Sequence, residues 1–213
     1  MGPGHLRWLS EVVCPTPAPQ IVCQEYVRAV NGHTERLQRL EQARHEQAQA
    51  WRLLPLVEAF QALRGVPCTV AGIIAAELGD LTRVDNPRQL RSSLGLTPSE
   101  YSRGERRRQG GITKAGHTQA RRALVEGAWA SRDPAKVSRH LQLRLEQRPK
   151  RLQDIGWKAH VRLCKRDRHL SARGKHAKQV VVAIARELSA FMWAIAQEVG
   201  LPGEGHVPSL LHW

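Results

Sequence analysis

Apolar side chains recur along this sequence mostly at three- and four-residue intervals, the spacing of one face of an α-helix. The longest such pattern covers residues 21–54 and has Glu, Gln and Arg on its flanks. It predicts a helical-hairpin arm or a coiled-coil helix, and it leaves the choice of partner open. A plain amphipathic helix packed on its own domain fits equally well, because the repeat becomes polar at Arg44 and Gln47. An irregular segment is predicted before the arm, where helix-breaking prolines follow one another: Pro15, Pro17 and Pro19.

Shorter helices are predicted after the arm. Pro55 suits a first helical turn, Gly79 suits a helix end, and Asn86-Pro87 suits the start of a third helix. Strand patterns are nearly absent, so the predicted fold is mainly α. The three predicted parts are a tail and arm (1–54), a compact helical domain (55–200) and a flexible tail (201–213). Within the domain, helices are predicted at about 55–63, 70–79, 87–94, 118–131, 135–147, around 157–170 and 177–199.

The first two domain helices are joined by the turn LRGVPCTVA, residues 63–71. Such a helix-hairpin-helix-like element can present backbone N–H groups to a phosphate. Here Pro67 and Cys68 occupy the turn, where a second glycine is usual. A hairpin that only packs and a hairpin that contacts DNA both fit this sequence, with packing slightly favoured.

The charge distribution indicates a polyanionic partner. The formal net charge is +14, and residues 101–176 carry 21 Lys or Arg against 6 Asp or Glu, so the rest of the chain is close to neutral. A basic excess confined to one segment is the expected footprint of nucleic acid. A solvated basic face is the alternative.

Cysteine spacing and apolar stretches limit the protein class. The four cysteines have neither CxxC nor zinc-finger spacing, so they are expected to be small buried hydrophobes in a reducing compartment. The apolar stretch 180–199 contains three charged residues, which are costly in a bilayer. A core helix, no membrane partner and a cytoplasmic, nucleoid-associated location are therefore predicted.

The stretch SEYSRGERRRQGGITKAGH, residues 99–117, is the strongest candidate for phosphate binding. Its glycines argue against a helix interior, so an irregular Gly/Arg loop or a small β-ribbon is expected. Guanidinium groups bind phosphate oxygens in a bidentate fork, and glycine allows close backbone approach. The next helix, capped by Thr113 or Thr118, also favours anions at its start. The predicted nucleic-acid-binding residues are Arg103, Gly104, Arg106, Arg107, Arg108, Lys114, Arg121 and Arg122.

Two serines in this stretch, Ser99 and Ser102, are candidate nucleophiles. A serine hydroxyl is a poor nucleophile at neutral pH and needs activation. Neighbouring arginines could stabilise the charge of a phosphoryl-transfer transition state. A turn or cap role is the more frequent role of a loop serine, so both roles stay open.

Three blocks in fixed order carry a family resemblance: ELGDLTRVDNPRQL (77–90), LGLTPSEYSRGERRRQGGITKAG (94–116) and QARRALVEGAW (119–129). They resemble the C-terminal domain of DEDD-type transposases of the insertion-sequence 110/116/902 group, which are similar to recombinases guided by a bridge RNA. The resemblance covers roughly residues 6–199. It implies DNA and a structured guide RNA as partners, and self-association through the arm.

The resemblance also implies a two-part enzyme. An N-terminal RuvC-like nuclease domain carries three Asp and one Glu that bind Mg²⁺, and the C-terminal domain supplies a serine that attaches to the cut DNA. Ser102 in YSRG is the best match to that serine. Relatives often read Ser-Ser-Gly or Ser-Thr-Gly there, so the family's serine corresponds to Ser102 or to the position of Arg103. His117 stands where the family usually has Asn.

Nothing in this sequence matches the nuclease domain. Glu77, Asp80 and Asp85 match the transposase domain and are expected to be cap and surface residues, so no metal ligand is predicted and Mg²⁺ is implied only for the full-length family. The prediction is a C-terminal transposase fragment for DNA transposition and recombination through a serine nucleophile, inactive without the nuclease domain. The alternative is a non-catalytic basic nucleic-acid-binding module. Whether this chain is itself an enzyme stays open.

Overall fold

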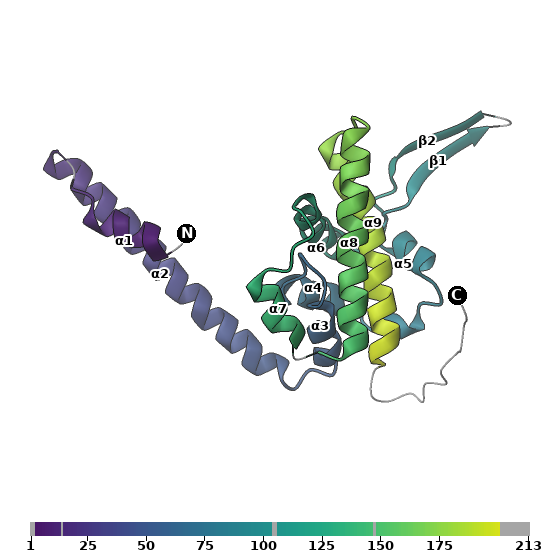
Figure 1. The fold of residues 1–213 in the computed structure, drawn as a ribbon, viewed down its shortest axis with the longest axis horizontal. Helices are drawn as coiled ribbons and strands as arrows, with labels where there is room; N and C mark the ends of the chain where they lie inside the picture. The colour runs from purple at the N-terminus through teal and green to yellow at the C-terminus, as the bar shows by residue number, and fades with distance from the viewer. Residues whose placement is uncertain (1–2, 14, 104–105, 147, 201–213) are drawn as a thin grey trace. The chain divides into compact units, whose positions relative to one another are not determined.

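The computed structural model describes residues 3–13, 15–103, 106–146 and 148–200 (Figure 1). The chain divides into two compact units, residues 1–51 and the part that starts at Arg52. The predicted domain boundaries at 54 and 200 stay predictions. The predicted flexible tail, 201–213, lies outside the described residues.

The first unit is a pair of helices, α1 (Pro3–Glu11) and α2 (Pro17–Ala48), and α1 packs on α2. The predicted irregular segment is limited to the short connection between the two helices, where Val12, Val13, Pro15 and Thr16 are not helical. The prediction is wrong for α1 and for Pro17 and Pro19. Helix α2 begins at Pro17, with Pro19 in its first turn. Proline is tolerated there because the first N–H groups of a helix have no acceptor within it.

Large apolar side chains stay exposed along α2. Tyr26, Leu37 and Leu40 are 71%, 57% and 59% exposed, and Val30 is 36% exposed. These four residues follow the spacing of one helix face, and we call them the arm stripe. Their exposure leaves an apolar surface available to a partner.

The second unit is a bundle of helices around its last described helix, α9 (Figure 1). Helices α3, α5, α6 and α8 and the short helix η1 all pack against α9. The mainly α prediction is confirmed. The elements in chain order are α3 (Leu54–Phe60), α4 (Cys68–Leu78), η1 (Leu81–Arg83), α5 (Pro87–Ser93), β1 (Pro98–Arg103), β2 (Arg106–Ile112), α6 (Thr118–Ala128), η2 (Trp129–Arg132), α7 (Arg139–Glu146), α8 (Lys150–Ala172) and α9 (Ala177–Val199).

Helix α9 forms the centre of the hydrophobic core. Ile184, Leu188 and Ile195 are at most 1% exposed. By length and composition, α9 is the one helix among the described residues that could cross a membrane. Its packing against helices on several sides accounts for that composition, because a helix enclosed by others needs apolar residues around much of its circumference. The structure thus places α9 as the core helix that the sequence predicts.

The cysteines differ in burial. Cys164 is 1% exposed, its thiol donates to the carbonyl oxygen of Asp133 at 3.3 Å, and burial raises the pKa of that thiol. Cys23 and Cys68 are only half-buried, and Cys14 lies outside the described residues. The expectation of buried cysteines therefore holds for Cys164 alone among the described ones.

Candidate nucleic-acid interface

The predicted phosphate-binding stretch forms an antiparallel β-ribbon that extends away from the helices of the second unit (Figure 1). In the register of β1 and β2, Ser102 lies opposite Arg107 and Arg103 lies opposite Arg106. The prediction of an irregular loop is wrong, and the alternative prediction, a small β-ribbon, is correct. In a two-stranded ribbon the inward-facing backbone N–H and C=O groups of each strand bond to the other strand, and the outward-facing groups are left to solvent.

We call β1, β2, the connecting residues 113–117 and the first turns of α6 the ribbon-and-helix surface. It contains the predicted binding residues except Gly104. For the four ribbon arginines the structure describes the backbone alone, and Gly104 lies outside the described residues. The described side chains among the predicted set are those of Lys114, Arg121 and Arg122.

Two glycines fix the base of the ribbon against the end of α5. Gly116 has a φ of +73°, and a Cβ there would overlap the carbonyl oxygen of Ser93. Gly95 has a φ of +61°, and a Cβ there would overlap the carbonyl oxygen of Ala115. This close approach sets the point at which the ribbon leaves the helices. Three backbone hydrogen bonds join the same segments: Thr113 N–H to Thr97 O (2.9 Å), Lys114 N–H to Gly95 O (3.1 Å) and His117 N–H to Ser93 O (3.2 Å).

Lys114 has an unusual backbone conformation. Its φ of +58° is the one positive value at a non-glycine position among the described residues, and its side chain is exposed. The left-handed region costs a residue with a Cβ about 1–2 kcal/mol. The hydrogen bond to Gly95 helps to hold this conformation in place. A cation held in a strained segment supports a binding role for residues 113–117.

The two arginines of α6 have different surroundings. Arg121 is half-buried, and its guanidinium donates to the carbonyl oxygens of Leu94 and Ala115, each at 3.0 Å. Arg122 is 75% exposed, with Nε 3.1 Å from a carboxylate oxygen of Glu126 one turn later. An exposed pair of this kind contributes little stability and is easily exchanged for a phosphate. Arg121 therefore ties the segments of the fold together, whereas Arg122 is open to a ligand.

The start of α6 differs from the prediction. His117 occupies the N-cap position, and no side-chain hydrogen bond caps this end among the described residues. Thr118 is already the first helical residue, and Thr113 belongs to the segment bonded to the end of α5. Neither threonine is the cap, so both cap predictions are wrong.

The two candidate serines both lie on β1, but the structure describes them differently. The Ser99 hydroxyl donates to the carbonyl oxygen of Gly111 across the ribbon at 3.0 Å, which is a structural role. Ser102 lies next to the end of β1, and the structure describes its backbone alone. Its role as a nucleophile stays a prediction.

The acidic residues Glu77, Asp80 and Asp85 do not fit a magnesium ion. A Glu77 carboxylate oxygen lies 3.4 Å from His117 Nδ1, and an Asp80 oxygen lies 4.0 Å from Arg83 Nε. Asp85 is exposed. Within the part of the chain that the structure describes, no three His, Cys, Asp or Glu residues are grouped to hold a metal. Mg²⁺ needs oxygen ligands in near-octahedral geometry, which these residues do not provide.

The turn between α3 and α4 packs inside the second unit. A Cβ on Gly65 would overlap the carbonyl oxygen of Gly127 in α6. Arg64, in the same turn, donates to the carbonyl oxygen of Pro134 and lies within hydrogen-bond distance of His160 Nε2, each at 2.8 Å. The protein's own α6 and α8 therefore cover this turn, and its geometry favours the packing hairpin over the DNA-contacting one.

His160 makes this contact sensitive to pH. It is 4% exposed, and burial, followed by the charge of Arg64, lowers its pKa. Since a histidine in an unfolded chain has a pKa of about 6.5, the unfolded state binds more protons below that pH. We therefore expect the free energy of unfolding to fall as the pH drops from about 6.5 toward the folded-state pKa.

Urea unfolding at neutral and mildly acidic pH measures this effect. His160→Gln keeps an acceptor for Arg64 but does not titrate, so its pH dependence should be smaller than that of the wild type. His169→Gln, an exposed histidine on the same helix, is the matched control and should behave like the wild type. The same pH dependence in His160→Gln and the wild type would contradict the assignment.

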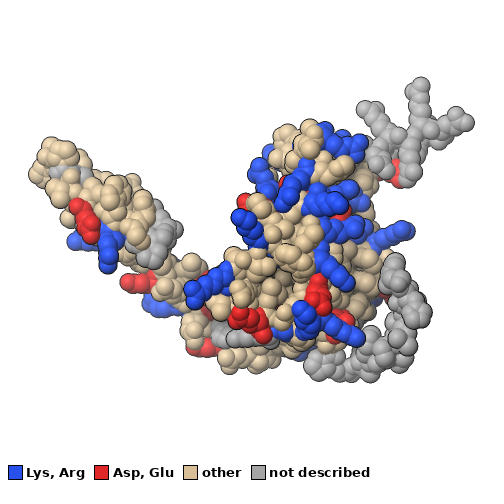
Figure 2. Space-filling model, in the orientation of Figure 1, with Lys and Arg blue, Asp and Glu red and all other residues tan. Residues whose placement is uncertain are grey.

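A second basic surface lies on α8, where Lys and Arg side chains gather on the face shown in Figure 2. Lys158 and Lys165 are exposed, and Arg162 and Arg166 each contact Glu187 of α9, with N–O distances of 2.9 and 3.4 Å. None of these residues is among the predicted binding residues. The helical spacing of these basic residues is a signal that the sequence contains. Their contact with Glu187 could not be read from it, because α9 follows much later in the chain.

The family model "Transposase IS116/IS110/IS902 family" matches residues 57–142, which include the ribbon-and-helix surface. The Sinorhizobium fredii protein "Putative transposase y4qE" is 44% identical over 194 residues, 91% of this chain and 46% of that protein. The Pseudomonas aeruginosa protein "Probable family 20 transposase" is 32% identical over 145 residues, 63% of this chain and 41% of that protein. The chain thus spans less than half the length of these two relatives.

Proposed function

Since the chain belongs to the IS116/IS110/IS902 transposase family, we propose that its ribbon-and-helix surface binds DNA during transposition. The observation that carries the proposal is an antiparallel ribbon with four arginines, whose base is hydrogen-bonded to the segment that holds Lys114 and leads into α6, the helix of Arg122. Guanidinium and ammonium groups so concentrated attract the phosphates of a nucleic acid. A structured guide RNA, which the resemblance implies, is a proposed second ligand.

Ser102 is the proposed nucleophile of a phosphoryl-transfer step. Its Oγ attacks a backbone phosphorus, a phosphoserine ester forms, and the bond from phosphorus to one neighbouring sugar oxygen breaks. The hydroxyl proton passes to solvent, and the departing sugar oxygen takes up a proton. A guanidinium at position 107, opposite Ser102 in the strand register, would stabilise the charge that develops on the phosphoryl oxygens.

A binding module without chemistry is the second candidate. Ser99 and Arg121 favour it, because both lie in or beside the predicted stretch and both serve the fold through hydrogen bonds. Such a module would leave every phosphodiester of the DNA intact. The two candidates therefore differ in whether a covalent protein–DNA product forms.

Replacing Arg106, Arg107 and Arg108 together by glutamine should weaken binding to duplex DNA. Each lost phosphate contact reduces the slope of log affinity against log salt by about 0.9, so the slope should fall by up to about 2.7. Fluorescence anisotropy with a labelled duplex at several salt concentrations measures both the affinity and the slope.

A matched variant controls for net charge. Lys136, Arg139 and Lys150 are exposed and lie outside the ribbon-and-helix surface, so their triple glutamine variant loses the same charge elsewhere. We expect it to bind duplex DNA more tightly than the ribbon variant does. A flat salt response of the wild type, or equal losses in the two variants, would remove the basis of the binding proposal.

The arm stripe is proposed as a self-association surface, because apolar residues at coiled-coil spacing gain stability by packing on a second helix. Leu37→Asp together with Leu40→Asp should convert an oligomer into a monomer, as measured by light scattering after size exclusion. Arg39→Asp places the same acidic residue on the opposite side of α2 and should leave the mass unchanged. A wild-type monomer at high protein concentration would contradict the proposal.

A further inference from the structure

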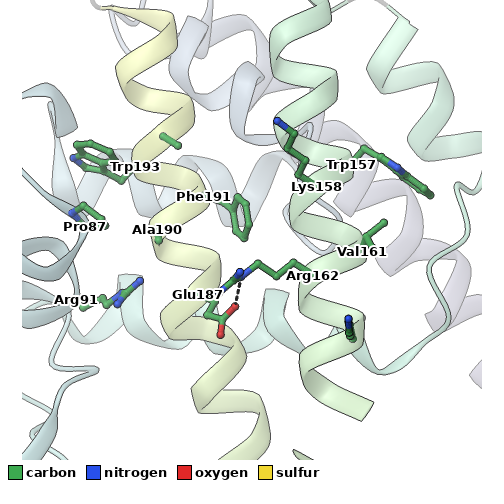
Figure 3. Close-up of a pocket in the computed structure, with 12 residues that line it drawn as sticks. Pro87, Arg91, Trp157, Lys158, Val161, Arg162, Glu187, Ala190, Phe191 and Trp193 are labelled. Atoms are coloured by element: carbon green, nitrogen blue, oxygen red, sulfur yellow. Dashed lines mark hydrogen bonds and ion pairs between the residues drawn. The ribbon is translucent and has the colours of Figure 1, made fainter. Parts of the chain in front are cut away.

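A groove crosses α9 between α8 and α5 (Figure 3). Its volume is about 1030 Å³. Sites for small organic ligands typically enclose about 300–1,000 Å³, so this groove has room for more than one ring system. We call it the aromatic–cationic groove after six of its lining residues: Arg91, Lys158, Arg162, Lys165, Phe191 and Trp193.

Two half-buried aromatic rings line the groove on either side of α9. Phe191 points toward α8, whereas Trp193 lies on the side of Pro87 and α5 (Figure 3). The Trp193 Nε1–H donates to the carbonyl oxygen of Val84 at 2.6 Å, which fixes the orientation of the indole. A ring held in this way can act as a platform on which a nucleobase stacks, and the exposed part of the Phe191 ring offers a second one.

The charges of the groove are complementary to a phosphate backbone. Four of its lining residues are cationic, and Glu187 is the one acidic residue among them. The two carboxylate oxygens of Glu187 already face Arg162 and Arg166. Lys158 and Lys165 are exposed and lie about 10 Å apart along the axis of α8, at a rise of 1.5 Å per residue.

We propose that the aromatic–cationic groove binds an unpaired DNA strand, with bases stacked on Phe191 and Trp193 and phosphates held by Lys158 and Lys165. Duplex DNA hides the faces of its bases, so stacking platforms favour an unpaired strand over a duplex. DNA is proposed rather than RNA because membership of a transposase family implies interaction with DNA. This site is additional to the ribbon-and-helix surface and does not depend on it.

The arm of a second copy is the competing occupant. Helix α2 carries four Arg and four Glu, so its charge is balanced and offers no complement to the groove. A single DNA strand carries a negative charge at every phosphate. Charge complementarity therefore selects the DNA strand.

The experiment compares a labelled oligothymidylate, which cannot pair with itself, with a duplex, using the full chain and fluorescence anisotropy. Phe191→Leu should weaken binding of the oligothymidylate by about 5- to 150-fold, the range for loss of one stacked base. Phe191→Tyr keeps the ring and should bind like the wild type. Lys158→Glu together with Lys165→Glu should reduce the salt slope for the single strand by at least about 1.4. Lys136→Glu together with Arg139→Glu is the charge-matched control. This control variant should bind oligothymidylate much more tightly than the variant with both groove lysines replaced.

The outcomes separate this site from the proposed ribbon function. The triple glutamine variant of the ribbon should retain oligothymidylate binding. If the ribbon proves not to bind duplex DNA, the groove substitutions should still weaken the binding of oligothymidylate. Unchanged oligothymidylate binding in Phe191→Leu, or an equal loss of duplex binding, would overturn the proposal. Tighter binding of oligouridylate than of oligothymidylate would overturn the assignment to DNA.

Two further readouts keep the test decisive. A changed oligomeric mass in Phe191→Leu with unchanged oligothymidylate binding would assign the groove to a second copy and overturn the proposal. Circular dichroism checks that each variant folds. If Phe191→Leu does not fold, the lysine pair and its control decide: loss of single-strand binding in the groove pair alone supports the site, and equal loss in both pairs overturns it.

Discussion

Ser102→Ala is expected to abolish covalent attachment of DNA to the protein while leaving DNA affinity nearly unchanged. The substitution removes the hydroxyl that would become the ester oxygen, but it removes no charge from the ribbon-and-helix surface. Loss of an essential nucleophile lowers the rate of a chemical step by several orders of magnitude, about 10⁶-fold in a well-measured hydrolase. Binding depends mainly on cations, so it should persist with the same salt slope.

The measurement uses a longer protein that adds the nuclease domain implied by the resemblance, together with end-labelled DNA and denaturing electrophoresis. Wild-type protein should give a labelled band that protease shifts, and Ser102→Ala should give none. Ser99→Ala is the control: it loses one exposed hydrogen bond to Gly111, worth about 1 kcal/mol, and should still form the adduct. An adduct that persists in Ser102→Ala and disappears in Ser99→Ala would move the nucleophile to Ser99.

Gly116→Ala should destabilise the second unit strongly and weaken DNA binding with it. A left-handed φ costs a residue with a Cβ about 1–2 kcal/mol. The added Cβ would also overlap the carbonyl oxygen of Ser93, and this backbone atom cannot rotate out of the way. We expect a total loss of at least about 2 kcal/mol in the free energy of unfolding. The ribbon should lose its fixed base at the same time.

Gly111→Ala is the matched control for this change. Gly111 lies in β2, its φ is not in the left-handed region, and a Cβ there would have no heavy atom within 4 Å. Urea unfolding should therefore show a clear loss in Gly116→Ala and little change in Gly111→Ala. Equal stability of the two variants would contradict the role assigned to the contact between Gly116 and Ser93.

The helices of the second unit could be predicted because their signals are local. Gly79 follows the last residue of α4, and Asn86 caps α5 by accepting hydrogen bonds from the N–H groups of Arg88 and Gln89, each at 3.0 Å. The start of α2 could not be predicted in the same way. Proline ends a helix in its interior and begins one in its first turn, and the residues around Pro17 do not distinguish the two cases.

The candidate site was predictable as a stretch of sequence but not as a geometry. In the sequence Arg121 and Arg122 are equivalent cations, yet Arg121 bonds to Leu94, 27 residues earlier, and so serves the fold. The ribbon depends on pairing between two strands, which composition does not encode. The aromatic–cationic groove depends on helix packing that brings Lys158 beside Phe191. Contacts between segments far apart in the chain decide these features.

At position 114, the stability of the backbone and the binding of DNA favour different residues. Glycine would relieve a conformational cost of about 1–2 kcal/mol there, but it would remove a cation from the proposed DNA surface. Selection for thermal stability alone would therefore favour glycine at this position, and selection for DNA binding would favour lysine. A thermostable version of this domain obtained without selection for binding would be expected to lose affinity at position 114 first.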